Sequence, residues 1–189
     1  MKSGTQNAPS GMLPLYAIVA GRAEHIPALN DIELAAARLL EGYAPESVLR
    51  EASSAAELRA AIDAGLLWVA VSDARPVGFA HVKLLETGRA HLDELDVHPE
   101  HGRRGVGRSL VRAVCEWAAG SYLDAVTLST FRAPPWNAPF YASMGFRALM
   151  EPELTPALRR VVAQETRRGL DPAQRVVMYR GTRRSQTWL

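Results

Sequence analysis

A run of glycines and arginines near the middle of the chain has the composition of an anion-binding loop. It spans residues 98–108, between a stretch of alternating apolar residues and a stretch with helical periodicity. Glycines let the backbone approach a ligand closely, and the free amides and dipole of a first helical turn favour negative charge. Arginines add countercharge. A phosphate-bearing ligand is therefore expected here, and its expected contacts are Gly102, Arg103, Arg104, Gly105, Val106, Gly107 and Arg108.

The spacing of this run resembles the central motif of the GNAT N-acetyltransferases. The run lacks the Lys-Ser/Thr pair that ends a P-loop, and its glycines are not spaced as in the dinucleotide fingerprint. The GNAT motif reads Gln/Arg-x-x-Gly-x-Gly/Ala after a strand that ends in Val-x-Pro, and here Gly102-Arg-Arg-Gly-Val-Gly107 follows Leu95-Asp-Val-His-Pro99. Gly102 replaces the first Gln or Arg of the motif. Because that stretch contacts the pyrophosphate through main-chain amides in the family, the replacement is expected to have little effect.

A later segment carries a second resemblance to the same family. Trp136-Asn-Ala-Pro-Phe-Tyr-Ala-Ser-Met-Gly-Phe146 is similar to the family element Asn…Phe-Tyr-x-x-x-Gly-Phe. The family tyrosine protonates the departing coenzyme A thiolate, which implies that role for Tyr141. With an ordinary pKa of about 10, a tyrosine is a neutral donor at pH 7. A half-buried aromatic on a short helix is the alternative, and Asn137 is expected to cap that helix or to touch the cofactor.

The resemblance also implies that acetyl-CoA is the acetyl donor. In the family, the strand before the loop splays from its neighbour, and its backbone pairs with the pantetheine arm. Leu95 and Val97 would make those contacts here, and the main-chain N–H of Val97 would polarise the thioester carbonyl. Ordinary core packing of the two side chains is compatible with this role, because different atoms serve each.

Acetyl transfer to an amine also needs a group that takes up a proton, because a primary amine is almost wholly protonated at pH 7. Strand alternation places four residues on one face: His91, Asp93, Leu95 and Val97. By the resemblance, Asp93 is the first candidate for the base and His91 the second. Glu94 faces the other way unless a β-bulge shifts the register, and it is a reserve candidate. For each of them a solvated strand face is the alternative.

The acceptor site is expected to involve Trp136, Asp93 and Glu94. Trp136 lies in a Pro-Pro-Trp loop beside the catalytic segment, and loops of this kind often carry specificity. Segments 42–51 and 132–137 are the expected specificity loops, and no rule converts their sequences into an acceptor.

The elements that must position these groups follow one another in a mixed order. Patterning predicts helices over 25–40, 54–64, 137–144 and 154–169 and a further one after the glycine run. It predicts strands over 15–20, 66–72, 76–86, 89–97, 125–131, 146–150 and 175–180. The fold class expected is α/β (α+β), with a GNAT-like mixed, mostly antiparallel central sheet flanked by helices. One domain is expected at 13–182, with a flexible leader at 1–12 and a basic tail at 183–189.

Composition limits the classes of partner that we expect the protein to bind. The 22 basic and 20 acidic residues leave a formal charge of +2, so no global field favours nucleic acid or a membrane surface. The one cysteine, Cys115, is expected to be a buried structural thiol, and no metal-ligand spacing is evident. The polar N-terminus favours a cytoplasmic protein. A homodimer is expected only by analogy with the family.

The leading hypothesis is an acetyl-CoA-dependent N-acetyltransferase that transfers the acetyl group directly to a primary amine of a small molecule. Acetylation of a protein lysine or N-terminus is the runner-up. A non-catalytic acyl-CoA-binding regulator is the third reading, and the presence of Tyr141 and of a polar residue at Asp93 argues against it.

Overall fold

The computed structural model describes residues 16–86 and 88–182, and the expected leader and basic tail lie outside them. Its centre is a seven-stranded sheet in the order β1-β2-β3-β4-β5-β7-β6, in which every pairing is antiparallel except that of β4 with β5. The strands are β1 Ala17–Ala20, β2 Leu67–Ser72, β3 Arg75–Glu86, β4 Arg89–Val97, β5 Ala125–Phe131, β6 Arg147–Ala148 and β7 Arg175–Gly181. The expected mixed, mostly antiparallel sheet is confirmed.

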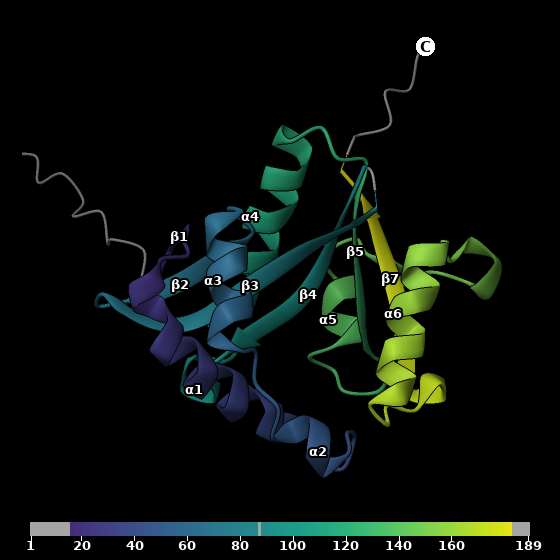
Figure 1. Ribbon diagram of the computed structural model, residues 1–189, viewed down its shortest axis with the longest axis horizontal. Coiled ribbons are helices and arrows are strands. Elements are labelled where there is room, and N and C mark those ends of the chain that lie inside the picture. Colours follow the sequence, from purple (N-terminus) through teal and green to yellow (C-terminus); the bar gives the residue numbers. More distant parts are fainter. Residues whose placement is uncertain (1–15, 87, 183–189) are drawn as a thin grey trace, which may run out of the picture.

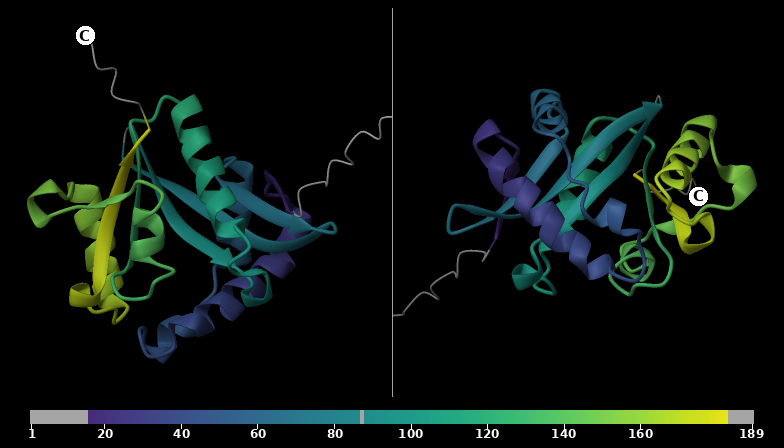
Figure 2. Two further views of the ribbon diagram at one scale, coloured as in Figure 1. Left: turned by 180° about the vertical axis from the view of Figure 1, so that it is seen from behind. Right: turned by 60° about the horizontal axis from the view of Figure 1, so that its bottom comes forward.

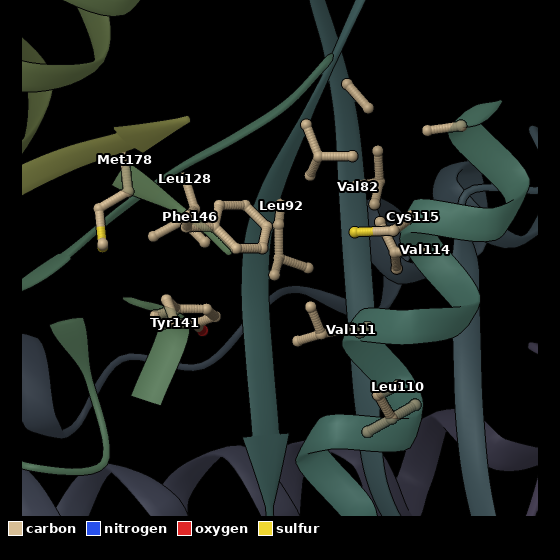
Figure 3. Close-up of a cluster of buried hydrophobic side chains, with 14 of the residues drawn as sticks. Val82, Leu92, Leu110, Val111, Val114, Cys115, Leu128, Tyr141, Phe146 and Met178 are labelled. Carbon is tan, nitrogen blue, oxygen red and sulfur yellow. The ribbon is translucent and has the colours of Figure 1, made fainter. Parts of the chain in front are cut away.

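Helices cover both faces of the sheet (Figures 1 and 2). Two hydrophobic clusters divide the core, one between the sheet and α4 and the other between the sheet, α1 and α3. Figure 3 shows the first cluster, with the Cys115 sulfur directed into it from α4, so the expected buried thiol is confirmed. The helices are α1 Ile26–Ala37, α2 Glu46–Leu49, α3 Ala55–Asp63, α4 Val106–Gly120, α5 Ala138–Ala142 and α6 Pro156–Arg167.

The local signals explain most of these boundaries. Ser54 caps α3, and Glu57 completes the expected capping box by accepting from the Ser54 amide at 2.9 Å. Strands β4 and β5 have the expected bounds. Helix α2 was not predicted, since its four residues are too few to show a periodicity. In the described part of the chain, no helix is long and apolar enough to cross a membrane.

Strands β4 and β5 separate partway along their length. Their parallel pairing runs from Arg89↔Ala125 to Leu92↔Leu128 and then stops, although each strand continues. The two ribbons diverge beyond this point (Figure 1). The splayed strand that the family resemblance implies is therefore present, and main-chain groups at the end of β4 are left without a partner from β5.

A β-bulge at Asp93 changes the side-chain alternation of β4. His81 of β3 pairs with Glu94 and Val82 pairs with Leu92, so Asp93 is an extra residue between two ladder partners. Leu92 before the bulge and Leu95 after it both pack in the α4 cluster. The expectation of one face shared by His91, Asp93, Leu95 and Val97 is therefore wrong, because the bulge shifts the period by one residue.

Candidate active site

A cavity of about 1500 Å³ opens where β4 and β5 diverge. Its lining includes the end of β4, the glycine-rich loop, α5 and one side of α6. The cavity has two parts. The part beside residues 102–108, Leu95 and Val97 is called the cofactor half here, and the part beside Glu94, Asp96, Tyr141 and α6 is called the acceptor half.

The cofactor half contains a helix N-terminus with free amides. Gly105 precedes α4 with φ +84°, a left-handed conformation that strongly favours glycine. Ser109 is the first residue of the helix whose amide is bonded, to the Gly105 carbonyl at 3.0 Å. Within the described residues, the amides of 106–108 have no acceptor, so they can bind an anion. Gly102 is extended and has no such conformational need.

The three arginines of this loop lie on the surface, and two of them contact side chains of other segments. Arg108 donates to Ser143 Oγ at 3.0 Å, which ties α4 to the segment after α5. Arg104 lies 3.5 Å from the Tyr16 hydroxyl. Arg103 and Arg108 line the cavity, whereas Arg104 lies outside its lining. Two arginines therefore add positive charge to the cofactor half.

Tyr141 lines the acceptor half from α5. Phe140 and Phe146 pack edge-on against its ring, with centroids 5.1 and 5.8 Å away. Burial, followed by the charges of Asp96 and Glu94, raises the pKa of Tyr141 well above its ordinary value. The phenol therefore stays protonated through the neutral range. Such a group can donate a proton and cannot serve as a base.

Asp93, the first-choice base, lies in the cavity wall but is already paired. Its carboxylate contacts Lys83 Nζ at 2.7 Å and lies 3.8 Å from His81 Nδ1. The bulge directs it toward these β3 side chains. Its role as base remains a prediction.

Glu94 and Asp96 line the same cavity from alternate positions of β4. Burial raises the pKa of Glu94 well above its usual range, and Asp96 and Asp93 add to this. Burial and then Glu33 do the same to the pKa of Asp96. Glu33, on α1, accepts from the Ser53 amide at 3.1 and 3.0 Å. The acceptor half therefore contains two carboxyl groups whose pKa values are raised, so they bind a proton more tightly than a free carboxylate does.

His91, the second-choice base, lies at the point where β4 and β5 separate. It is 3% exposed, and its Nδ1 lies 3.0 Å from Thr127 Oγ1, which in turn donates to the Ala90 carbonyl at 3.1 Å. Burial lowers the pKa of His91, so the imidazole is neutral at pH 7. It lines the cavity and remains a candidate.

Helix α6 forms the far wall of the acceptor half. Glu165 accepts from Ser129 Oγ at 2.8 Å and pairs with Arg175, whose guanidinium stacks over Phe131 at 4.5 Å. Both members of the ion pair are 13% exposed. This network fixes α6 to β5 and β7. At the end of the helix, Arg168 Nε donates to Glu51 at 3.0 Å and links α6 to the segment after α2.

The loop before α5 is held differently from the way the sequence suggested. Asn137 does not cap α5 with its side chain, and instead its Nδ2 donates to Thr130 Oγ1 at 2.9 Å. Asn137 occupies the N-cap position of α5, as expected, but without the expected side-chain cap, because its amide group is bonded to Thr130 at the end of β5. Asn137 still lines the cavity, as does Trp136, which is 42% exposed. Their contacts with cofactor and acceptor remain predictions.

Sequence reasoning missed two features of the site. Asp96 was placed on the opposite face from the site residues, and only the bulge brings it and Glu94 into the cavity. The Glu165–Arg175 pair joins residues from two elements and shows no local motif. The sequence did contain one signal for a site here, the three carboxyl residues at 93, 94 and 96. Asp and Glu are depleted in strands, so three of them in one strand suggest a function.

Comparisons with known proteins agree with this geometry. The PaiA N-acetyltransferase of Thermoplasma acidophilum, solved with coenzyme A, matches with a TM-score of 0.68 at 18% identity over 88% of this chain and 98% of that one. The N-acetylglutamate synthase of Neisseria gonorrhoeae, solved with coenzyme A and N-acetyl-glutamate, gives 0.67 at 20% identity over 92% of this chain and 36% of that one. These identities show a shared fold.

A third structure, Rv2747 of Mycobacterium tuberculosis with coenzyme A and NLQ, gives a TM-score of 0.61 at 19% identity over 86% of this chain and 97% of that one. The model of the acetyltransferase (GNAT) family matches residues 33–146, which include the glycine-rich loop, the splayed strand and Tyr141. The chain therefore belongs to the GNAT acetyltransferase family, whose acetyl donor is acetyl-CoA.

Proposed function

We propose that this acetyltransferase transfers the acetyl group directly to a primary amine of a small molecule. The observation that carries the proposal is one cavity that holds free helix amides at one end and Tyr141 with two carboxyl groups at the other. Cys115 is buried in the α4 cluster and does not line that cavity. A thiol acyl-enzyme is therefore not supported, and direct transfer is the simpler route.

The residues present fit acetyl-CoA. The amides of 106–108 and the neighbouring arginines suit its phosphates, and the unpaired edge of β4 at Leu95 and Val97 suits its pantetheine amides. When bound, acetyl-CoA supplies a thioester whose carbonyl carbon accepts an amine. We assign the Val97 amide to the carbonyl oxygen, where charge develops.

A proton acceptor and a proton donor complete the reaction. A carboxyl of β4 takes one proton from the ammonium form of the acceptor, which leaves a nucleophilic nitrogen. The C–N bond then forms, the C–S bond breaks, and Tyr141 gives its proton to the leaving sulfur. The second nitrogen proton restores the tyrosine. One proton per turnover reaches solvent, so charges and atoms balance.

The shape of the acceptor half favours a small molecule. The Arg168–Glu51 contact connects the end of α6 to the segment after α2, and Arg168 lines the cavity. The buried Glu165–Arg175 pair holds the rest of α6 in place. A polypeptide acceptor would need room along this wall, and these contacts hold the wall in one position.

A thiol-release assay with acetyl-CoA tests the proposal. The panel contains aliphatic amines, amino acids, polyamines, aminoglycosides and peptides, and the enzymes are wild type, Tyr141→Phe and the control Tyr122→Phe, whose hydroxyl is on an 84% exposed side chain. Turnover of a small amine that falls at least ~10-fold only in Tyr141→Phe supports the proposal.

Two results would assign a different function. Acetylation confined to peptides would assign a protein substrate. Tight binding of acetyl-CoA without turnover of any amine or peptide would contradict catalysis and assign a regulator that senses acyl-CoA.

A further inference from the structure

We propose that the acceptor amine carries an apolar tail of several carbons, which binds against a group of apolar side chains in the acceptor half. The inference rests on the proposed function and names the substrate class within it. It concerns a binding contact at a distance from the reacting nitrogen.

The first observation is a set of apolar side chains that line the cavity without belonging to the core. They come from four separate elements and are Leu39, Leu40, Val48, Leu85 and Val161. Within the described part of the chain, none of the five belongs to either hydrophobic cluster. Each keeps part of its surface open, and Leu39 is 46% exposed. These five residues are called the apolar lining here.

The end of α1 presents one side of this lining. Residues Ala36, Leu39 and Leu40 line the cavity at intervals of three and four positions, over the last turn of α1 and the 3₁₀ turn Arg38–Leu40 that follows it. Residues at this spacing lie on one face of a helix. An amphipathic helix normally buries its apolar face against the core. Here the face is directed into the catalytic cavity, and a ligand can cover it.

Helix α6 presents the other side. Its cavity-facing residues at helical spacing are Val161, Gln164, Glu165 and Arg168. The two charged members already have protein partners, since Glu165 pairs with Arg175 and Arg168 pairs with Glu51. Beyond these pairs, the face offers a ligand the apolar surface of Val161 and one side-chain amide.

The acetyl donor does not account for the apolar lining. Its phosphates and pantetheine arm are assigned to the start of α4 and the edge of β4, and an acetyl group adds only one methyl beyond the thioester carbonyl. The lining belongs instead to the end of α1, to α2, β3 and α6, and it is continuous with Tyr141 in one cavity. Covering apolar surface is favourable in proportion to its area. The molecule left to cover it is the acceptor.

The size of the cavity agrees with a tail. Pockets for small molecules usually enclose roughly 300–1000 Å³. This cavity measures about 1500 Å³. It therefore has room for the end of the cofactor and for an acceptor that extends from the amine along the lining.

The experiment measures kcat/KM with acetyl-CoA for propylamine, butylamine, pentylamine and hexylamine. These amines are almost equally basic, so their rates differ through the tail alone. Each methylene that the lining covers should raise kcat/KM about two- to four-fold, the range for a CH₂ group partly or fully removed from water. In wild type, hexylamine should therefore exceed propylamine about 10- to 60-fold.

Two substitutions make the lining more polar, and two matched ones act outside it. Leu39→Gln and Val161→Thr should each lower the ratio of hexylamine to propylamine at least ~3-fold. The controls are Leu84→Gln and Val162→Thr, at an exposed leucine and a half-buried valine outside the cavity lining, and they should leave the ratio unchanged. A ratio measured within one protein does not depend on how much of it is folded.

Binding is measured separately from turnover. N,N-dimethylpropylamine and N,N-dimethylhexylamine are tertiary amines whose neutral forms have no N–H, so they cannot form an amide. Calorimetric titration of the coenzyme A complex should show the same preference for the longer chain. The same two lining substitutions should reduce that preference.

Three results would overturn the inference. The first is a series in which neither rate nor affinity rises with chain length, which would leave the lining to a second copy of the chain, as sedimentation analysis would show. The second is an equal ratio in wild type and in both lining variants. The third is a preference for hexanoyl-CoA over acetyl-CoA with every amine, which would assign the lining to the acyl group.

Failure of this inference is separable from failure of the proposed function. Amine turnover without any dependence on chain length overturns the apolar tail alone. Tighter binding of the longer tertiary amine without turnover of any primary amine overturns the proposed reaction alone.

Discussion

The cofactor half and the acceptor half of the cavity are built from different parts of the chain. The cofactor half uses main-chain amides at the start of α4 and the unpaired edge of β4, and one glycine at φ +84° sets the geometry. The acceptor half uses side-chain carboxyls and one phenol, packed so closely that their pKa values rise. The first half depends on backbone shape, and the second depends on individual atoms. Their responses to substitution should differ accordingly.

The largest expected effect comes from a single oxygen atom of the acceptor half, the hydroxyl of Tyr141. Removing the hydroxyl in Tyr141→Phe should lower kcat about 100-fold, within the range for loss of a general acid, with the Kd of coenzyme A unchanged. Stopped-flow kinetics and calorimetry measure the two quantities. A comparable loss of coenzyme A affinity would mean that the tyrosine belongs to the cofactor half.

The next effect tests the cofactor half through its backbone. In Gly105→Ala the new Cβ meets nothing within 4 Å, so the only penalty is the left-handed φ, about 1–2 kcal/mol. The Kd of coenzyme A should rise about 10-fold while the amine KM stays within a factor of two.

Gly120→Ala is the matched control for that substitution. It also adds a Cβ in open space, but at a position without positive φ, and should not weaken coenzyme A binding. Equal effects of the two substitutions on the Kd of coenzyme A would contradict a role for the left-handed φ at Gly105.

A smaller effect concerns stability, which the substitution of this site residue should raise. A carboxyl whose pKa is raised on folding binds protons more tightly in the folded chain, so stability falls as pH rises from its ordinary pKa through the raised one. Asp96→Asn removes that loss. The variant should be about 1 kcal/mol more stable than wild type at pH 8, and the difference should vanish near about pH 4.

Urea unfolding of the two proteins at several pH values measures this difference. A variant that is less stable than wild type at pH 8 would indicate that Asp96 has a structural partner and no strain to relieve.

The smallest effect concerns the contact between the end of α6 and the segment after α2. Glu51 and Arg168 are about half exposed, with side-chain values of 51% and 48%, so their pair should contribute less than about 1 kcal/mol. Glu51→Gln should raise the amine KM two- to five-fold and leave the acetyl-CoA KM unchanged. A double-mutant cycle with Arg168→Gln should show coupling. Additive effects would mean that the contact between Glu51 and Arg168 does not influence acceptor binding.

The same division explains what the sequence could predict. The glycine run, the strand before it and Phe140-Tyr141 are local patterns, so the cofactor half and the strand bounds of β4 and β5 followed from them. Asp96 could not be assigned, because its face depends on a bulge that the pairing with β3 decides. The positions of Glu165 and Arg175 depend on how α6 packs on the sheet. The side-chain partner of Asn137 could not be predicted either, because Thr130 lies on β5, before the loop that leads into α5.

The extra residue at Asp93 divides the nine residues of β4 into two stretches whose side chains alternate in opposite phase. Before it, even-numbered side chains enter the α4 core, and after it odd-numbered ones do. If Asp93 took an ordinary place in the ladder, with no bulge, Glu94 and Asp96 would turn into that core and Leu95 and Val97 would move to the acceptor side. The pairing of β4 with β3, as much as the composition of β4, therefore specifies the site. Relatives in which β4 pairs here without a bulge should differ in the acceptors they accept, even where every motif residue is the same.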